Sequence, residues 1–116
     1  MMTIILRKTE QLMHQLNELK NTYEEGKEPA KDRAFFLYVK QETEPIFHLL
    51  DEWEALAIDL INKQQISIHE QQIHATKDNM KKLMMHSYYA DVRKRRYMDI
   101  YKSCKYIFNQ LLKETK

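Results

Sequence analysis

The chain has 116 residues, of which 43% are hydrophobic and 31% charged, with one glycine, two prolines and a formal net charge of +2. This length suits a single domain with one core over residues 1–116, and the composition excludes a disordered chain. The scarcity of glycine and proline excludes an all-β fold with many tight turns, and it excludes a glycine-rich phosphate loop. A few long helices are the expected architecture.

The first predicted helix spans residues 3–25. Apolar side chains from Ile5 to Tyr23 recur at helical spacing, with Thr9 filling a gap in the stripe. Gly26 follows at the position where helices end in a left-handed residue, and the polar stretch 27–31 should be a loop.

The second predicted helix spans residues 32–63, with Asp32 as its N-cap. Pro45 cannot donate the hydrogen bond that a continuous helix needs. Either a short helix ends near Glu42 and a new one starts with Pro45 in its first turn, or one helix kinks there. The sequence leaves both alternatives open. Phe35, Phe36 and Val39 are expected to give the start of this segment its apolar face.

Two more helices are predicted over residues 68–89 and 92–114. Ser67 and Glu70 match a capping box at the start of the first of these. The last helix should bury Tyr97, Tyr101 and Cys104 on its apolar stripe. Four helices with short links predict an all-α, up-and-down antiparallel four-helix bundle, with the second helix broken or kinked near Pro45. We expect a monomer.

The compartment is predicted from two features. Cys104 is the only cysteine, so no internal disulfide forms, which fits a reducing cytoplasm. The apolar run at the N-terminus turns charged at Arg7 and is too short for a signal peptide or a membrane span. We therefore expect a cytoplasmic protein with no membrane partner.

Charge is distributed unevenly along the chain. Residues 77–116 hold eleven Lys and Arg against four Asp and Glu, a net of +7, whereas residues 1–76 hold eight against thirteen, a net of −5. The only dense charge run is Arg93, Lys94, Arg95 and Arg96, in a stretch that also carries Tyr88, Tyr89, Tyr97 and Tyr101.

The basic run has two interpretations. The one we favour is pairing with carboxylates of the acidic helices, for which the candidates are Glu24, Glu25 and Glu52, with Asp91 as a compensating cap. The functional interpretation is contact with phosphate groups, with Tyr89 or Tyr97 available for base stacking.

Five histidines and a single cysteine are the candidate metal ligands and nucleophile of the chain. Three Glu and His pairs are four residues apart, and they are Glu10 with His14, Glu44 with His48, and Glu70 with His74. The Glu-x-x-His spacing of di-iron bundles is absent, so solvated surface pairs are favoured, and no metal or cofactor is expected. A cysteine on an apolar stripe packs as a small hydrophobe, so no catalytic residue is assigned.

The chain resembles the YppE-like proteins, an uncharacterised family of low-GC Gram-positive bacteria. The resemblance extends from about Tyr23 to the C-terminus and implies an all-helical up-and-down bundle, with no known activity, cofactor or partner. It singles out four polar residues with no obvious packing role, Lys77, Asp78, Asn79 and Asp99. The matching residues are Gly26-Lys27, Phe35-Phe36, Trp53, Leu60-Ile61, His69, Gln72-Ile73, Lys77-Asp78-Asn79, Ser87-Tyr88, Lys94-Arg95-Arg96-Tyr97 and Asp99-Ile100.

The expected function is that of a non-catalytic module that binds a protein. The alternatives are a nucleic-acid binder that contacts the phosphate backbone and, as a third hypothesis, a metal-dependent bundle enzyme. The candidate binding surface consists of Arg93, Lys94, Arg95, Arg96, Tyr89 and Asp99.

Overall fold

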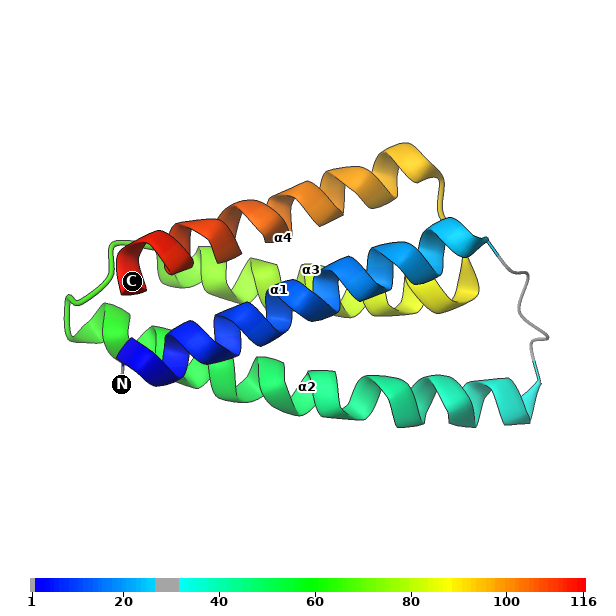
Figure 1. Ribbon diagram of the computed structural model, residues 1–116, viewed down its shortest axis with the longest axis horizontal. Helices are drawn as coiled ribbons and strands as arrows, with labels where there is room; N and C mark the ends of the chain where they lie inside the picture. The colour runs from blue at the N-terminus through cyan, green and yellow to red at the C-terminus, as the bar shows by residue number, and fades with distance from the viewer. Residues whose placement is uncertain (1, 27–31) are drawn as a thin grey trace.

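Four long helices make up the fold, and they alternate in direction (Figure 1). The computed structural model describes residues 2–26 and 32–116. Both termini lie at one end of the bundle. The predicted all-α antiparallel bundle is confirmed, while the loop expected over 27–31 lies outside the described residues. The helices are α1 (Met2–Glu25), α2 (Arg33–Asn62), α3 (Glu70–Tyr89) and α4 (Lys94–Thr115).

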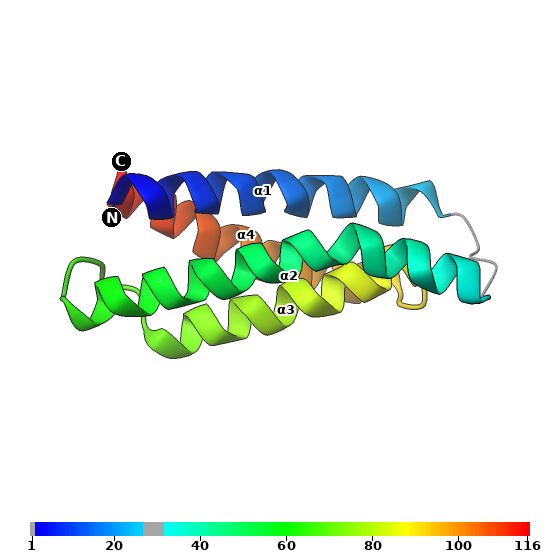
Figure 2. The same cartoon turned by 90° about the horizontal axis from the view of Figure 1, so that it is seen from below.

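The four helices are not equivalent in their packing. Helices α1 and α3 each lie beside the three others, whereas α2 and α4 lie diagonally across the bundle and meet through core side chains such as Trp53 and Phe108. Figure 2 shows α2 and α3 side by side below α1. Since the backbone of α4 lies beside only α1 and α3, a broad face of α4 points away from the bundle. Within the described part of the chain, no helix is both long and apolar enough to cross a membrane.

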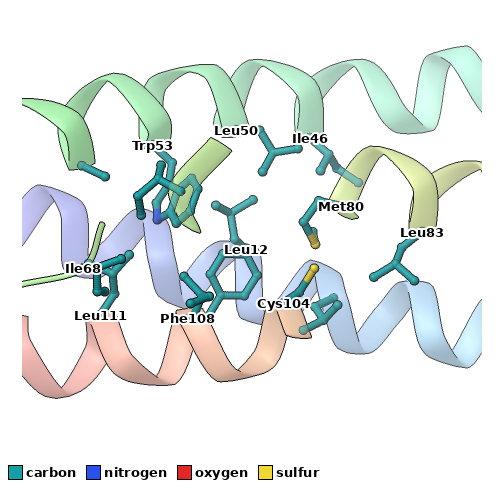
Figure 3. Packing of buried hydrophobic residues seen from close by; sticks show 14 of the residues in the cluster. Leu12, Ile46, Leu50, Trp53, Ile68, Met80, Leu83, Cys104, Phe108 and Leu111 are labelled. Atoms are coloured by element: carbon teal, nitrogen blue, oxygen red, sulfur yellow. The ribbon is translucent and has the colours of Figure 1, made fainter. Parts of the chain in front are cut away.

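The core is centred on two aromatic rings from α2 and α4. Trp53 and Phe108 meet edge to face, with centroids 5.4 Å apart, and Leu12 of α1 lies beside them (Figure 3). The Trp53 indole N–H donates to the Thr9 hydroxyl over 3.1 Å, and Thr9 donates in turn to the Ile5 carbonyl over 2.7 Å. The polar residue in the α1 stripe therefore satisfies the one polar atom of the buried tryptophan.

Helix α2 continues through Pro45 without a break. Of the two alternatives left open by the sequence, a new helix starting at Pro45 is excluded. Pro45 carries no N–H, so the Gln41 carbonyl loses its usual partner four residues on. Gln41 and Pro45 are both exposed, and water can hydrate that carbonyl at little cost.

The start of α2 is only partly as predicted. Asp32 caps the helix by accepting from the Phe35 N–H over 2.8 Å, and Val39 is buried at 3% exposure. The expectation that Phe36 belongs to the apolar face is wrong, because its side chain is 56% exposed. In Figures 1 and 2 the first turns of α2 extend past the ends of α1 and α3, so the neighbouring helices cover these turns only in part.

The capping box predicted from Ser67 and Glu70 is also wrong. Helix α3 begins at Glu70 with His69 as N-cap, and the Gln72 side-chain oxygen accepts from the His69 N–H over 3.0 Å. Ser67 instead donates through its N–H and its hydroxyl to one Glu114 oxygen, over 2.8 and 2.7 Å. A carboxylate from the far end of the chain has taken the place of the local partner.

Candidate functional site: the basic corner and the outer face of α4

The link between α3 and α4 is held together by tyrosines. Tyr97 is fully buried and stacks on Tyr23 with ring centroids 3.9 Å apart and planes inclined by 4°. Its hydroxyl and that of Ser87 hydrogen-bond over 2.6 Å, while the Tyr23 hydroxyl donates to the Val92 carbonyl over 2.5 Å. Burial raises the pKa of Tyr97 to about 12. The prediction that Tyr97 and Tyr101 belong to the core is confirmed.

The turn itself closes without the cap expected from Asp91. Ala90 ends α3 in the left-handed conformation, with φ of 48°. Asp91 contacts His86 Nδ1 over 2.8 Å, back toward α3, and Arg93 occupies the N-cap position of α4 with no side-chain hydrogen bond. The expectation that Asp91 caps α4 is therefore wrong, since its carboxylate already has a partner on the preceding helix.

Arg93, Lys94, Arg95 and Arg96, here called the basic corner, are all exposed. None of the four has a carboxylate of the described residues within 4.0 Å. The favoured pairing with acidic helices is therefore wrong for these residues. Two of the proposed partners are bound elsewhere, because Glu24 pairs with Lys20 over 3.4 Å and Glu52 pairs with Lys8 over 2.6 Å.

Tyr89 has a neighbour that the sequence did not indicate. Its ring meets Phe35 of α2 edge to face, with centroids 5.3 Å apart, and the side chain is half-buried. One turn of α2 further on, Tyr38 makes the same kind of contact with Tyr88 at 6.0 Å. These contacts hold the start of α2 against the end of α3, which gives Tyr89 a packing role.

Positive charge continues from the corner along the whole of α4. Residues 93–116 carry eight Lys and Arg against two Asp and Glu, a net of +6. All eight cations are exposed, and within residues 2–26 and 32–116 none of them is ion-paired. The residues spaced by helical turns on the side opposite the core form what we call the outer face of α4: Arg95, Asp99, Lys102, Tyr106 and Lys113.

A shallow groove of about 480 Å³ runs between α3 and α4 along one edge of this outer face. Its lining combines polar and apolar side chains from both helices. Tyr106, at the border of groove and outer face, is 64% exposed. The side chains that line the groove include Gln72, Thr76, Asn79, Lys102, Ser103 and Tyr106.

The four polar residues singled out by the family resemblance do not converge. Lys77 turns toward α2 and contacts Asp51 over 2.7 Å and Glu54 over 3.0 Å, and these hydrogen bonds raise its pKa. Asn79 lines the groove toward α4, while Asp78 and Asp99 are exposed. Asn79 and Asp99 therefore lie near the basic surface, whereas Lys77 faces α2.

A charged network joins α2 to α3 at the position of Lys77. His74 contacts Glu54 over 2.8 Å and Glu70 over 3.3 Å, and hydrogen bonds to these two carboxylates raise its pKa. Partial burial of Glu54 acts to raise its pKa, but the hydrogen bonds from His74 and Lys77 outweigh it, so the pKa is lowered. The network fastens two helices and leaves both His74 ring nitrogens occupied.

The structure also bears on the metal and nucleophile hypotheses. In the part of the chain that the structure describes, no group of three or more His, Cys, Asp and Glu residues is arranged to hold a metal ion. Cys104 is buried, its Sγ lies 3.9 Å from the Thr76 carbonyl, and burial raises its pKa to about 12. A thiol in that state is not an activated nucleophile.

Sequence reasoning missed Lys102 and Tyr106. Charge density along the sequence singles out the run of four cations and does not extend to Lys102 or Tyr106. The helical spacing from Arg95 through Lys102 to Tyr106 was the available signal, because these residues fall on one side of a helix whose opposite side is apolar.

Comparisons with known proteins agree on one family. A family model described as a bacterial domain of unknown function (DUF1798) matches residues 9–115. The chain is 31% identical over 111 residues to the Bacillus subtilis protein named "Uncharacterized protein YppE", covering 95% of this chain and 90% of that one.

Solved structures of relatives have the same fold. The crystal structure of Bacillus subtilis YppE superposes with a TM-score of 0.87 at 30% identity, covering 98% of this chain and 94% of that chain. Its solution NMR structure gives 0.83 at 30% identity over 97% and 92%. A Listeria innocua protein of unknown function gives 0.84 at 22% identity over 96% and 90%, which supports the fold alone.

Proposed function

This chain belongs to the DUF1798 family of bacterial domains, and we propose that it is a non-catalytic interaction module that binds a protein through the basic corner. One observation carries this proposal. The four exposed cations of the corner have no ion-pair partner among the described residues. Uncompensated charge of one sign on a small surface favours a partner of the opposite sign.

The absence of catalysis is part of the proposal. It is supported by the state of the side chains that chemistry would need. The Cys104 thiol is buried with a raised pKa, and both ring nitrogens of His74 are held by carboxylates. We also propose that the protein acts as a monomer in the cytoplasm, a setting in which a lone thiol stays reduced.

A nucleic acid is the second candidate partner, and the same unpaired cations favour it. Two observations favour a protein partner over a nucleic acid. Tyr89 packs edge to face on Phe35, which occupies the ring that base stacking would use. Asp99 lies exposed one turn beyond Arg95, where its carboxylate would repel a phosphate backbone.

The test is affinity capture from a lysate of the source organism, carried out with and without nuclease treatment. We compare the wild type with Arg95→Glu/Arg96→Glu. The control is Arg7→Glu/Arg33→Glu, which changes the net charge by the same amount but at positions on α1 and α2. Arg7 and Arg33 are exposed and lie outside the basic corner. Quantitative mass spectrometry should find a protein that the wild type and the control capture and the corner variant loses.

Two results would contradict the proposal. If no captured protein depends on the corner, the corner is not a protein-binding site. If capture disappears on nuclease treatment, and a DNA or RNA duplex binds the wild type with a steep salt dependence, the second candidate replaces the first.

A further inference from the structure

We propose that the partner's binding segment is an acidic amphipathic helix that docks along the outer face of α4, with its edge in the groove between α3 and α4. This inference rests on the proposed function and extends it from the basic corner to a defined surface. It names the partner chemistry, a helix with carboxylates along one side and a few apolar or amide side chains beside them.

The contrast in ion pairing between α4 and the other helices is the first argument. Five of the nine cations described before Ala90 pair with a carboxylate within 4.0 Å, and they are Lys8, Lys20, Lys40, Lys63 and Lys77. The other four, Arg7, Arg33, Lys81 and Lys82, have no such partner among the described residues. The eight cations of residues 93–116 have none among the described residues, although the chain as a whole carries seventeen Asp and Glu.

The shape of the surface is the second argument. Three of the cations, Arg95, Lys102 and Lys113, recur on the outer face of a helix of 22 residues, about 33 Å long at 1.5 Å per residue, so positive charge extends from the basic corner along that face. The groove of about 480 Å³ runs beside that face. A helix laid into such a groove brings its own side chains at three- and four-residue spacing against Arg95, Lys102 and Lys113.

Tyr106 and Asn79 give the surface its specificity. Tyr106 is 64% exposed at the border of the groove and can be covered by an apolar side chain of a partner. Tyrosines that become buried at an interface are frequent binding hot spots. Asn79 offers both a donor and an acceptor inside the groove, which suits amide or carboxylate groups of a protein.

Two other occupants fit less well. A phosphate backbone is negative along its whole length, whereas Asp99 places a carboxylate between Arg95 and Lys102 on the outer face. A protein can place a neutral or basic side chain at that one position. A symmetric contact between α4 helices of two copies would bring cations against cations, which repels.

The experiment is a selection of 16-residue peptides from a displayed random library on the full-length protein. Enriched peptides are then measured by fluorescence anisotropy against the wild type and three variants. The variants are Lys102→Glu/Lys113→Glu, Tyr106→Ala, and the charge-matched control Arg7→Glu/Arg33→Glu. Circular dichroism checks that each variant keeps its helical signal.

We expect enriched peptides to carry net negative charge with apolar residues at helical spacing. Their affinity should fall about tenfold or more with Lys102→Glu/Lys113→Glu, fall several-fold with Tyr106→Ala, and stay within about twofold of the wild type with the control. Raising the salt concentration from about 50 to 300 mM should weaken the binding of these peptides to the wild type, because the charges are exposed and are screened by salt.

Other outcomes overturn the inference. Neutral or basic peptides, no enrichment, or binding insensitive to Lys102→Glu/Lys113→Glu would each do so. Capture from lysate could depend on the basic corner and yet be unaffected by Lys102→Glu/Lys113→Glu or Tyr106→Ala. That result would support the proposed function and would show that the outer face of α4 is not the binding surface. Tighter binding of a DNA duplex than of any peptide would assign the surface to nucleic acid. Self-association in sedimentation that Lys102→Glu/Lys113→Glu abolishes would assign it to a second copy of the chain.

Discussion

A double-mutant cycle on Ser87 and Tyr97 tests whether the hydrogen bond between these two residues stabilises the link between α3 and α4. The two hydroxyls hydrogen-bond over 2.6 Å, and the residues are 2% and 0% exposed. Tyr97→Phe keeps the ring stacked on Tyr23 and removes only one hydroxyl. Ser87→Ala removes the other.

The expected magnitudes follow from leaving a buried polar atom without its partner. Each single change should cost about 1–2 kcal/mol of unfolding free energy, because the remaining hydroxyl is buried and unpaired. The double variant removes both groups, so its cost should fall short of the sum of the singles by about 1 kcal/mol or more.

The assay is urea unfolding followed by far-ultraviolet circular dichroism, which reports all four helices together. The control is Tyr106→Phe, whose side chain is 64% exposed and whose effect should stay within about 0.5 kcal/mol. A thermal melt gives a second readout, since 1 kcal/mol moves the midpoint by about 3–6 °C in a domain of this size. Stability unchanged in Tyr97→Phe, or strictly additive losses in the double variant, would refute the assigned role of this hydrogen bond.

Three more predictions concern titration, reactivity and the C-terminal end. The pKa of His74 is raised in the fold, so its contribution to stability is present below the ordinary histidine pKa of 6.5 and is lost as pH rises through the folded pKa. The pKa of Glu54 is lowered, so its contribution to stability is lost as pH falls below about 4.5. The stability advantage of the wild type over His74→Gln in urea unfolding should therefore be largest at about pH 5–6 and shrink by pH 8. Cys104, buried with a pKa of about 12, should react with a disulfide reagent only slowly in the native protein and promptly in denaturant, as followed by thiolate release. Glu114→Ala removes the acceptor of two Ser67 hydrogen bonds and should cost about 1–2 kcal/mol in urea unfolding.

Each of these predictions has a result that contradicts it. An advantage over His74→Gln that is flat or grows between pH 6 and 8 would show that the contacts with the two carboxylates do not stabilise the protonated ring. Stoichiometric labelling of Cys104 within the mixing time would mean that the thiol is accessible. For Glu114→Ala, the control is Glu114→Gln, which keeps one accepting oxygen; equal losses in both variants would assign the effect to charge and not to the Ser67 bonds.

Periodicity predicted the parts of this fold that depend on one helix at a time. The buried faces of α1 and α4 follow from spacing alone, because the face that carries Leu12 or Phe108 is fixed by 3.6 residues per turn. Gly26, with φ of 61°, ends α1 in the left-handed conformation for the same local reason.

The wrong predictions concern relations between helices. Phe36 is exposed, and the first turns of α2 extend past the ends of α1 and α3 (Figure 1). Spacing within α2 does not reveal where α1 or α3 ends. Ser67 bonds to Glu114, 47 positions away, so no local capping pattern could have indicated it. The contacts of Lys77 with α2 depend on the rotation of one helix against another, which a single sequence without aligned homologues does not define.

The sequence predicted one part of the candidate site, the basic corner, and did not predict the groove between α3 and α4. The run from Arg93 to Arg96 stands out by composition, but whether the cations are paired depends on which carboxylates the fold brings near. The groove beside Lys102 and Tyr106 arises only where α3 and α4 meet, and Asn79 was noticed without any indication of what it faces.

An NMR titration of the ¹⁵N-labelled protein with an enriched acidic peptide would locate the bound segment. We expect the largest amide shifts along residues 95–113 of α4 and at Asn79 of α3, with α2 nearly unchanged. Shifts concentrated on the exposed residues Phe36, Leu37 and Tyr38 of α2, or no shifts at saturating peptide, would contradict binding along the outer face of α4.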